Sequence, residues 1–190
     1  MKQEEVVIRL HKPDTSEMLF FFLCGVITSV PLTLFIAQYA NSLLVGFSAF
    51  YATLISAAVF SPFIEEFSKA FPLFYRHGET ERSIVNLALF VGLGFGVVEL
   101  LTYVFLLGYS PIVRLPGLFF HPASTSVTAY GIAKKRPMPF YAIAVAFHFS
   151  NNFLALTNPS PPVSASIAIV ALTVFTSWQL HGRTKERIVV

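Results

Sequence analysis

The chain contains the uncharged stretch MLFFFLCGVITSVPLTLFIAQ at residues 18–38. A helix needs about 20 mostly apolar residues to cross a bilayer, so this stretch alone predicts a membrane span. Five further apolar stretches follow at residues 43–74, 84–107, 115–133, 138–156 and 163–180, joined by short connections. The sequence therefore predicts an all-α, polytopic membrane protein built as a bundle of six transmembrane helices.

The composition agrees with a lipid environment. Apolar residues make up 55% of the chain and charged residues only 12%, whereas a soluble domain is roughly 45–50% apolar. The net charge of +3 does not indicate a nucleic-acid partner, because the Lys and Arg residues form short clusters between the apolar stretches. The single cysteine, Cys24, allows no internal disulfide, and no Cys/His spacing indicates a zinc module.

The positive residues predict the orientation of the helices, because Lys and Arg concentrate in short cytoplasmic loops. With six spans, every Lys and Arg except Lys69 and Arg114 falls on one side of the membrane. Five or seven spans would put one tail on the other side. We therefore expect cytoplasmic tails at residues 1–17 and 182–190 around a transmembrane domain at residues 18–181. A short strand at residues 6–9 fits the first tail, and no removed signal peptide is expected.

The second stretch, residues 43–74, is longer than a bilayer requires and contains Pro62 and Pro72. Proline removes a backbone donor and clashes with the preceding turn, so we expect a kink or break near residues 61–62. Broken helices in membranes border cavities. In the third stretch, the glycines at positions 92, 94 and 96 predict close helix packing.

Ionisable side chains inside the predicted spans indicate a functional site, because a charge in the bilayer costs several kcal/mol unless it is paired or hydrated. At 1.5 Å per residue from the charged helix ends, four different helices bring such groups about 16–25 Å into the membrane. The sequence therefore predicts one shared polar layer. Its members are Glu65, Glu66, Lys69, Glu99, His121 and His148, with Asn152 just beyond.

Some residues of this polar layer also have simpler structural explanations. Lys69 and Glu65 are four residues apart, so an ion pair on one helix face explains both. Glu66 points about 100° away from Glu65, so one acid enters the cavity while the other braces it, and the sequence leaves open which. His148 and Asn152 share a face and offer two hydrogen-bond donors in one direction.

The same spacing of four recurs at His121 and Thr125, where the hydroxyl either orients the imidazole or satisfies backbone near Pro122.

A buried carboxylate can serve as a general base for water, and aligned donors can stabilise an oxyanion. No Ser–His pair, Gly-x-Ser-x-Gly turn or reactive cysteine competes, so water is the expected nucleophile. The same acids and imidazoles equally suit a divalent metal such as zinc with a bound water.

Four short segments resemble the motifs of one family. Residues 65–69 (EEFSK) resemble the EExxK motif of the PrsW-type intramembrane proteases, residues 95–99 (FGVVE) their FxxxE motif, and residues 148–152 (HFSNN) their HxxxD/N motif. Residues 121–125 (HPAST) are similar to the family's HAxxT segment. The resemblance also points to the wider CPBP superfamily of CAAX prenyl endopeptidases and bacteriocin-processing enzymes.

The resemblance implies a prokaryotic plasma-membrane endopeptidase that cleaves a membrane protein or membrane-associated peptide without a required cofactor. In that interpretation Glu65 activates water, Glu99 assists it, and His148 with Asn152 forms the oxyanion hole. Asn152 replaces the usual aspartate, which favours a donor over a metal ligand. Glu99 replaces the histidine of the prenyl endopeptidases, which argues against prenylated substrates. The remaining site residues are Glu66 and His121.

Two other classes of function stay open. Membrane carboxylates and histidines also form relays, so a proton- or ion-coupled transporter is one alternative, although no inverted repeat is evident. A catalytically inactive scaffold that binds membrane segments is the other.

Overall fold

The computed structural model describes residues 10–157 and 162–189. The strand expected at residues 6–9 lies outside these ranges. Within them the chain is helical, and the one β-type contact is an isolated antiparallel bridge between Thr80 and Ile188. The all-α prediction is therefore confirmed for the described residues.

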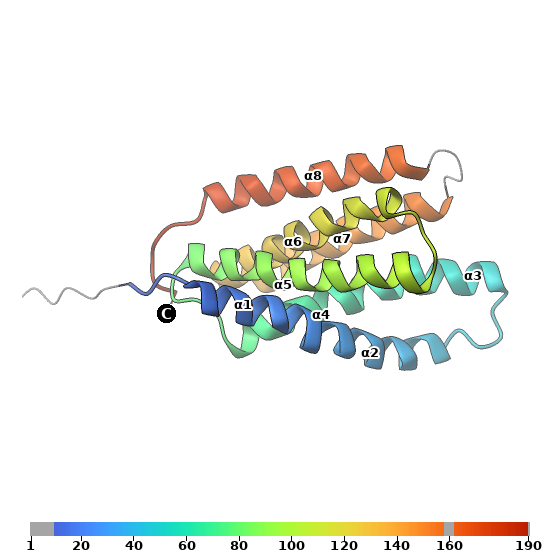
Figure 1. The fold of residues 1–190 in the computed structure, drawn as a ribbon, viewed down its shortest axis with the longest axis horizontal. Helices are drawn as coiled ribbons and strands as arrows, with labels where there is room; N and C mark the ends of the chain where they lie inside the picture. Colours follow the sequence, from blue (N-terminus) through green and yellow to red (C-terminus); the bar gives the residue numbers. More distant parts are fainter. Residues whose placement is uncertain (1–9, 158–161, 190) are drawn as a thin grey trace, which may run out of the picture.

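Figure 1 shows the helices lying side by side along one long axis. They form six continuous helical segments. The first joins α1 (Thr15–Cys24), the π-helix η1 (Gly25–Ser29) and α2 (Val30–Ser42); the second joins α3 (Ala49–Leu54), the π-helix η2 (Ile55–Phe60) and α4 (Ser61–Tyr75); the third joins α5 (Glu81–Leu101) and the π-helix η3 (Thr102–Leu106); and the last three are α6 (Pro111–Ala133), α7 (Pro137–Thr157) and α8 (Pro162–Gly182).

Within the described parts of the chain, three helical segments are long and apolar enough to cross a membrane: Thr15–Ser42, Glu81–Leu106 and Pro137–Thr157. A shorter apolar helix covers Ser166–Gly182. The outer surface is apolar as well, with large side chains such as Leu34 and Phe35 exposed on α2. Helices of this length and surface are those of an integral membrane protein.

Two helices begin one turn before their apolar stretch because polar residues cap them. Asp14 Oδ1 accepts the Glu17 N–H at 2.8 Å, and Thr80 Oγ1 accepts the Ser83 N–H at 3.1 Å. The second segment begins later than residue 43, because the chain first turns through Gly46 at φ 96°, a conformation that favours glycine.

The disruption expected near residues 61–62 takes the form of η2, which ends directly before α4. Pro62 has no backbone N–H, so carbonyls of the preceding turn lack a helical donor. One of them, Ala57 O, accepts a hydrogen bond from Asn152 Nδ2 of α7 at 2.9 Å. The helix therefore continues through the disruption and is held there by a side chain from another element.

Glycines in α5 allow its neighbours to approach closely. A Cβ atom on Gly92 would lie 2.5 Å from His121 O of α6, and one on Gly94 would lie 2.1 Å from Phe22 O of α1. Both distances are prohibitive, so close packing is confirmed at Gly92 and Gly94, whereas a Cβ atom on Gly96 would meet only ordinary contacts at 3.4 Å or more. The backbone of α6 is thereby fixed against α5 at His121 itself.

Both described chain ends meet at one end of the bundle. His11 N donates to Glu79 Oε2 at 3.1 Å, and Val189 N donates to Glu79 O at 2.9 Å. Beside them the buried Glu81 carboxylate accepts hydrogen bonds from Lys134 at 2.6 Å and Arg187 at 2.7 Å. The described parts of the two tails thus lie at the same end, together with several of the positive residues.

Candidate active site

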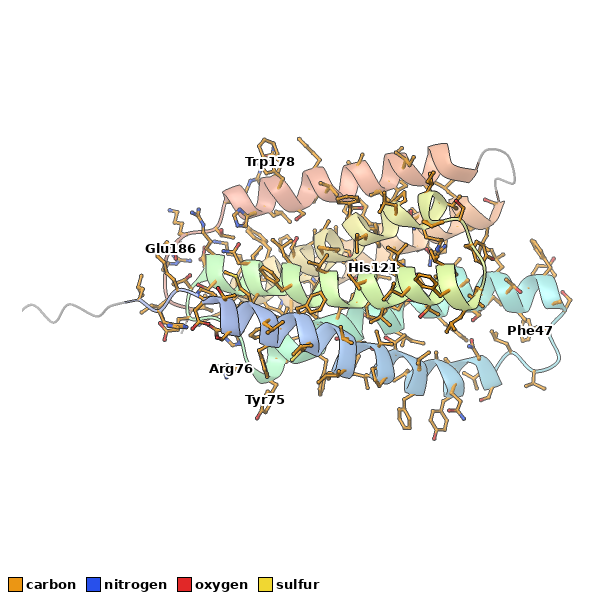
Figure 2. The ribbon with its side chains drawn as sticks, in the orientation of Figure 1. Phe47, Tyr75, Arg76, His121, Trp178 and Glu186 are labelled. Atoms are coloured by element: carbon orange, nitrogen blue, oxygen red, sulfur yellow. The ribbon has the colours of Figure 1, made fainter. Side chains whose placement is uncertain are left out.

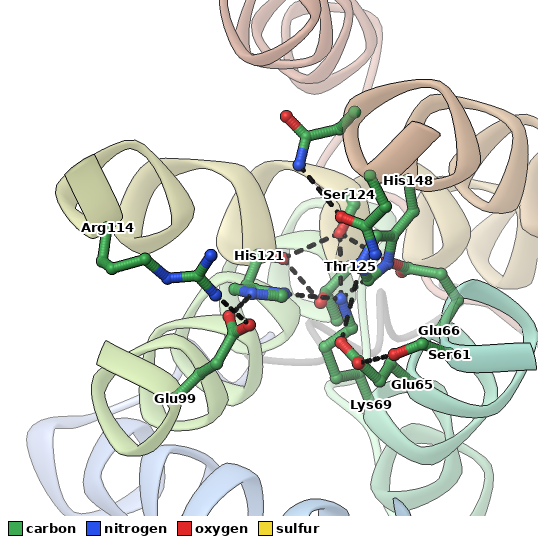
Figure 3. A network of polar contacts seen from close by, with 12 residues as sticks. Ser61, Glu65, Glu66, Lys69, Glu99, Arg114, His121, Ser124, Thr125 and His148 are labelled. Atoms are coloured by element: carbon green, nitrogen blue, oxygen red, sulfur yellow. Dashed lines mark hydrogen bonds and ion pairs between the residues drawn. The ribbon is translucent and has the colours of Figure 1, made fainter. Parts of the chain in front are cut away.

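A buried polar network runs through the middle of the bundle, with Lys69 of α4 at its centre (Figure 3). The Lys69 side chain is fully buried. Its Nζ donates to Glu66 Oε1 at 2.7 Å, to His121 Nδ1 at 3.1 Å and to Ser124 Oγ at 3.1 Å. The suggested ion pair of Lys69 with Glu65 is wrong, because the partner is Glu66, three residues away rather than four.

Glu66 is enclosed by its partners. Besides Lys69, its Oε1 accepts from His148 Nδ1 at 2.8 Å and from Ser124 Oγ at 3.1 Å, and the side chain is fully buried. An ammonium, an imidazole and a hydroxyl from three helices therefore hold one carboxylate oxygen. Such a carboxylate braces the network, which is one of the two roles that the sequence left open.

Glu65 occupies a different position, although it is the next residue in the chain. Its Oε1 accepts from Ser61 Oγ, and its Oε2 lies 3.6 Å from His148 Nε2. Among the described residues, its Oε2 has no hydrogen-bond partner, and the same is true of Oε2 of Glu66. Glu65 also lines a cavity of about 150 Å³ that it shares with Glu99. Glu65 therefore differs from Glu66 in having no Lys or Arg partner and in lining this cavity.

Glu99 of α5 forms a second group with two residues of α6. Its Oε2 contacts His121 Nε2, and its Oε1 accepts from the Arg114 guanidinium at 3.1 Å. That guanidinium also stacks over the Tyr103 ring, 3.2 Å from the centroid. Glu99 is therefore paired with a cation, as Glu66 is.

The partners of His121 fix its tautomer. An ammonium has no lone pair, so His121 Nδ1 accepts from Lys69 and Nε2 carries the proton toward Glu99. Thr125 Oγ1 donates to His121 O at 2.8 Å. Of the two roles left open for Thr125, this bond supports satisfaction of the backbone one turn before it. His121 is a neutral bridge between the two halves of the network.

A polar cavity of about 100 Å³ adjoins the network. This volume holds a few water molecules but no peptide. Asn152 reaches it while donating to Ala57 O, and Asn151 accepts from Ser166 Oγ at 2.6 Å. The polar side chains that line it are Glu99, Arg114, His121, His148, Asn151, Asn152 and Ser166.

The predicted convergence of four helices on one polar layer is confirmed. Glu65, Glu66, Glu99, His121 and His148 are linked through Lys69 and one another, and Asn152 lines the adjoining cavity. Figure 2 shows His121 between the two ends of the bundle, away from Arg76 and Glu186 at the end where the tails meet.

Sequence reasoning missed three members of the network, although each had a positional signal. Ser61 precedes Glu65 by four residues and Ser124 follows His121 by three, so each shares a helix face with its partner. Arg114 precedes His121 by seven residues, or two helical turns. It was read only as a topology signal on the outer side.

The described residues do not fit a metal ion. No three His, Cys, Asp or Glu side chains among them are arranged to hold one. The Lys69 ammonium takes the lone pairs of His121 Nδ1 and Glu66 Oε1, which a metal would need. The network already has a cation bound to one of its acids and one of its imidazoles.

Comparison with known proteins adds independent evidence. Residues 14–178 match the family described as PrsW family intramembrane metalloprotease. The match includes every residue of the network. Neither the curated proteins nor the solved structures include a match.

Proposed function

This chain belongs to the PrsW family of intramembrane metalloproteases and is an intramembrane peptidase, and we propose that Glu65 activates the water that attacks the scissile bond. One observation carries this choice. Glu66 is paired with Lys69 and Glu99 with Arg114, whereas Glu65 has no Lys or Arg partner among the described residues. Glu66 and Glu99 each accept a hydrogen bond from a permanent cation, whereas His148 Nε2 lies 3.6 Å from Glu65 Oε2, beyond hydrogen-bond distance. Glu65 is therefore the acid of the network that is held least by positive charge.

The charges of the network support a defined role for His148. Three carboxylates face two permanent cations, so a third positive charge balances the buried site. His148 is placed to carry it, because Nδ1 donates to Glu66 and Nε2 faces Glu65 Oε2. In this proposal His148 is an imidazolium, and its Nε2–H points to where charge develops on the scissile carbonyl.

The reaction follows from these positions. Water beside Glu65 Oε2 gives a proton to the carboxylate as its oxygen bonds to the carbonyl carbon. His148 Nε2–H and one N–H of Asn152 stabilise the oxyanion, while Asn152 keeps its other N–H on Ala57 O. The protonated Glu65 then donates to the leaving amine. Glu66, which is itself bound by Lys69, holds His148 in place. Glu99, His121 and Arg114 form the opposite wall of the polar cavity.

We propose further that this reaction needs no metal, because the Lys69 ammonium occupies the centre where ligands would converge. The four motifs also support membership of the CPBP superfamily. Glu99 in place of histidine argues for unmodified rather than prenylated substrates.

The proposal includes the topology: six spans with both tails cytoplasmic in a prokaryotic plasma membrane. The meeting of both described tail segments at Glu79 supports one side for both tails. The cluster of Lys and Arg residues at that end supports the cytoplasm.

A cleavage assay tests the function directly. Purified protein in liposomes is incubated with a library of single-span peptides, and products are mapped by mass spectrometry. Wild-type protein is expected to cleave within or beside the apolar span, and Glu65→Gln protein is not.

One observation favours proton transport as a second candidate: the network is a continuous chain from Arg114 to Glu65. A transporter moves protons in sealed liposomes without any peptide. A flux abolished by Glu99→Gln would establish that reading, and its absence in protein that cleaves peptides would exclude it.

A further inference from the structure

An apolar groove of about 630 Å³ runs between α6 and α8. Its walls include Ile112 and Phe119 of α6 and Val174, Phe175 and Trp178 of α8. These side chains are exposed, Trp178 to 66%, and Figure 2 shows Trp178 on the outer helix of the bundle. The groove therefore faces the lipid rather than the interior.

The groove adjoins the polar cavity of the candidate site. Pro116 of α6 and Val170 of α8 line both. The cavity itself is too small for a peptide. A substrate must therefore reach His148 and Asn152 from outside, and the groove meets the cavity at two apolar residues.

Polar contacts hold α8 on either side of the groove. Ser166 Oγ donates to Asn151 Oδ1 at 2.6 Å near one end, and Ser126 Oγ and Ser177 Oγ lie 2.5 Å apart toward the other. His181 and Asn86 are joined beyond that at 2.8 Å. Between these contacts α8 presents apolar side chains, so α8 forms a fixed wall with an apolar face.

We propose that this groove binds the apolar transmembrane segment of the substrate and presents its scissile bond at Pro116 and Val170. The proposal rests on the peptidase function given above. A peptide fits better than an acyl chain, because cleavage requires locally unwound backbone. Free backbone N–H and C=O groups need polar partners at membrane depth. Asn151, Asn152 and Ser166 offer such partners directly behind the groove.

Trp178, the single tryptophan of the chain, reports which molecule fills the groove. Glu65→Gln protein, which leaves substrate intact, is placed in phosphatidylcholine vesicles with brominated acyl chains, which quench exposed tryptophan. A tryptophan-free single-span peptide of about 20 apolar residues is then added. We expect loss of quenching as the peptide displaces lipid, and no change with a polar peptide of equal length. Quenching that persists at saturating peptide would identify lipid as the occupant and overturn the proposal.

A matched pair of substitutions tests the groove in the active enzyme. Ala171 lines the groove, whereas the neighbouring Leu172 is exposed and does not. We expect Ala171→Trp to lower kcat/KM at least about tenfold through KM, equal to ~1.4 kcal/mol of binding, and Leu172→Trp to leave it unchanged. Equal kcat/KM for both variants would contradict the groove. The quenching experiment measures binding rather than turnover, so loss of quenching in a protein that cleaves no peptide would sustain the groove and refute the proposed function.

Discussion

Lys69 Nζ lies 2.7 Å from Glu66 Oε1, although Glu65 is the acid one full helical turn away from it. This pairing gives two adjacent glutamates different surroundings, one braced by a cation and one without a Lys or Arg partner among the described residues. Glu66 receives the ammonium, an imidazole N–H and a hydroxyl, while Glu65 accepts from Ser61 and lines a cavity. The division of roles between them follows from where one cation is held.

The first prediction concerns stability. Lys69→Met leaves Glu66 buried without its counter-charge, which should lower the free energy of unfolding by roughly 3–5 kcal/mol. The double variant Lys69→Met/Glu66→Gln should recover most of this loss, because neither charge remains. Denaturant unfolding in detergent measures both, with Lys12→Ala at an exposed site as the control. A single variant as stable as wild type would show that the pair is not structurally important.

The network was predictable from the sequence to the level of which helices meet. A fixed rise per residue places Glu65, Glu99, His121 and His148 at similar depth once the charged helix ends are known. The choice of partner within the layer was not predictable. Residues at i+3 and i+4 both share a face, and Glu66 is selected by groups from α6 and α7.

The fold was likewise predictable from the sequence only in part. Apolar stretches predicted where the helices lie, because lipid requires long runs without charge. Pro62 predicted a disruption where η2 lies, but the bond from Asn152 to Ala57 O joins residues 95 apart, so no local pattern encodes that contact. Arg114 was assigned to topology alone, since its pairing with Glu99 depends on how α5 and α6 pack.

The second prediction concerns Asn152. Asn152→Ala removes an oxyanion donor, for which losses of ~10²–10³ in turnover are typical. It also leaves Ala57 O without its partner, which should cost ~1–3 kcal/mol of stability. Asn152→Asp keeps the shape but removes both N–H groups, so turnover and stability should fall together in this variant as well. Full turnover in Asn152→Asp would remove Asn152 from the oxyanion hole.

The third prediction concerns metal dependence. Because Lys69 holds the centre of the network, dialysis against a strong chelator should leave turnover unchanged. Metal analysis of the purified active protein should find less than one equivalent per chain. Activity that disappears on chelation and returns with zinc would refute the metal-free mechanism while leaving the peptidase assignment intact.

The fourth prediction concerns topology. In a Cys24→Ser background, Asn41→Cys should react with an impermeant maleimide added to intact cells, and Lys135→Cys should react only after permeabilisation. The reason is that Lys135 belongs to the positive cluster expected in the cytoplasm. Labelling of Lys135→Cys in intact cells would disprove the six-span arrangement with both tails inside.

Glu65→Gln tests the central claim most directly, because it keeps the shape of the side chain and removes the base. Turnover of a single-span peptide by the purified variant in liposomes should fall at least ~10²-fold. Substrate affinity should match wild type, and the free energy of unfolding should fall less than in Glu66→Gln, because Glu65 has no Lys or Arg partner among the described residues. Glu66→Gln, in contrast, should lose stability together with activity. Near-wild-type cleavage by Glu65→Gln would contradict the account and move the role of base to Glu66 or Glu99.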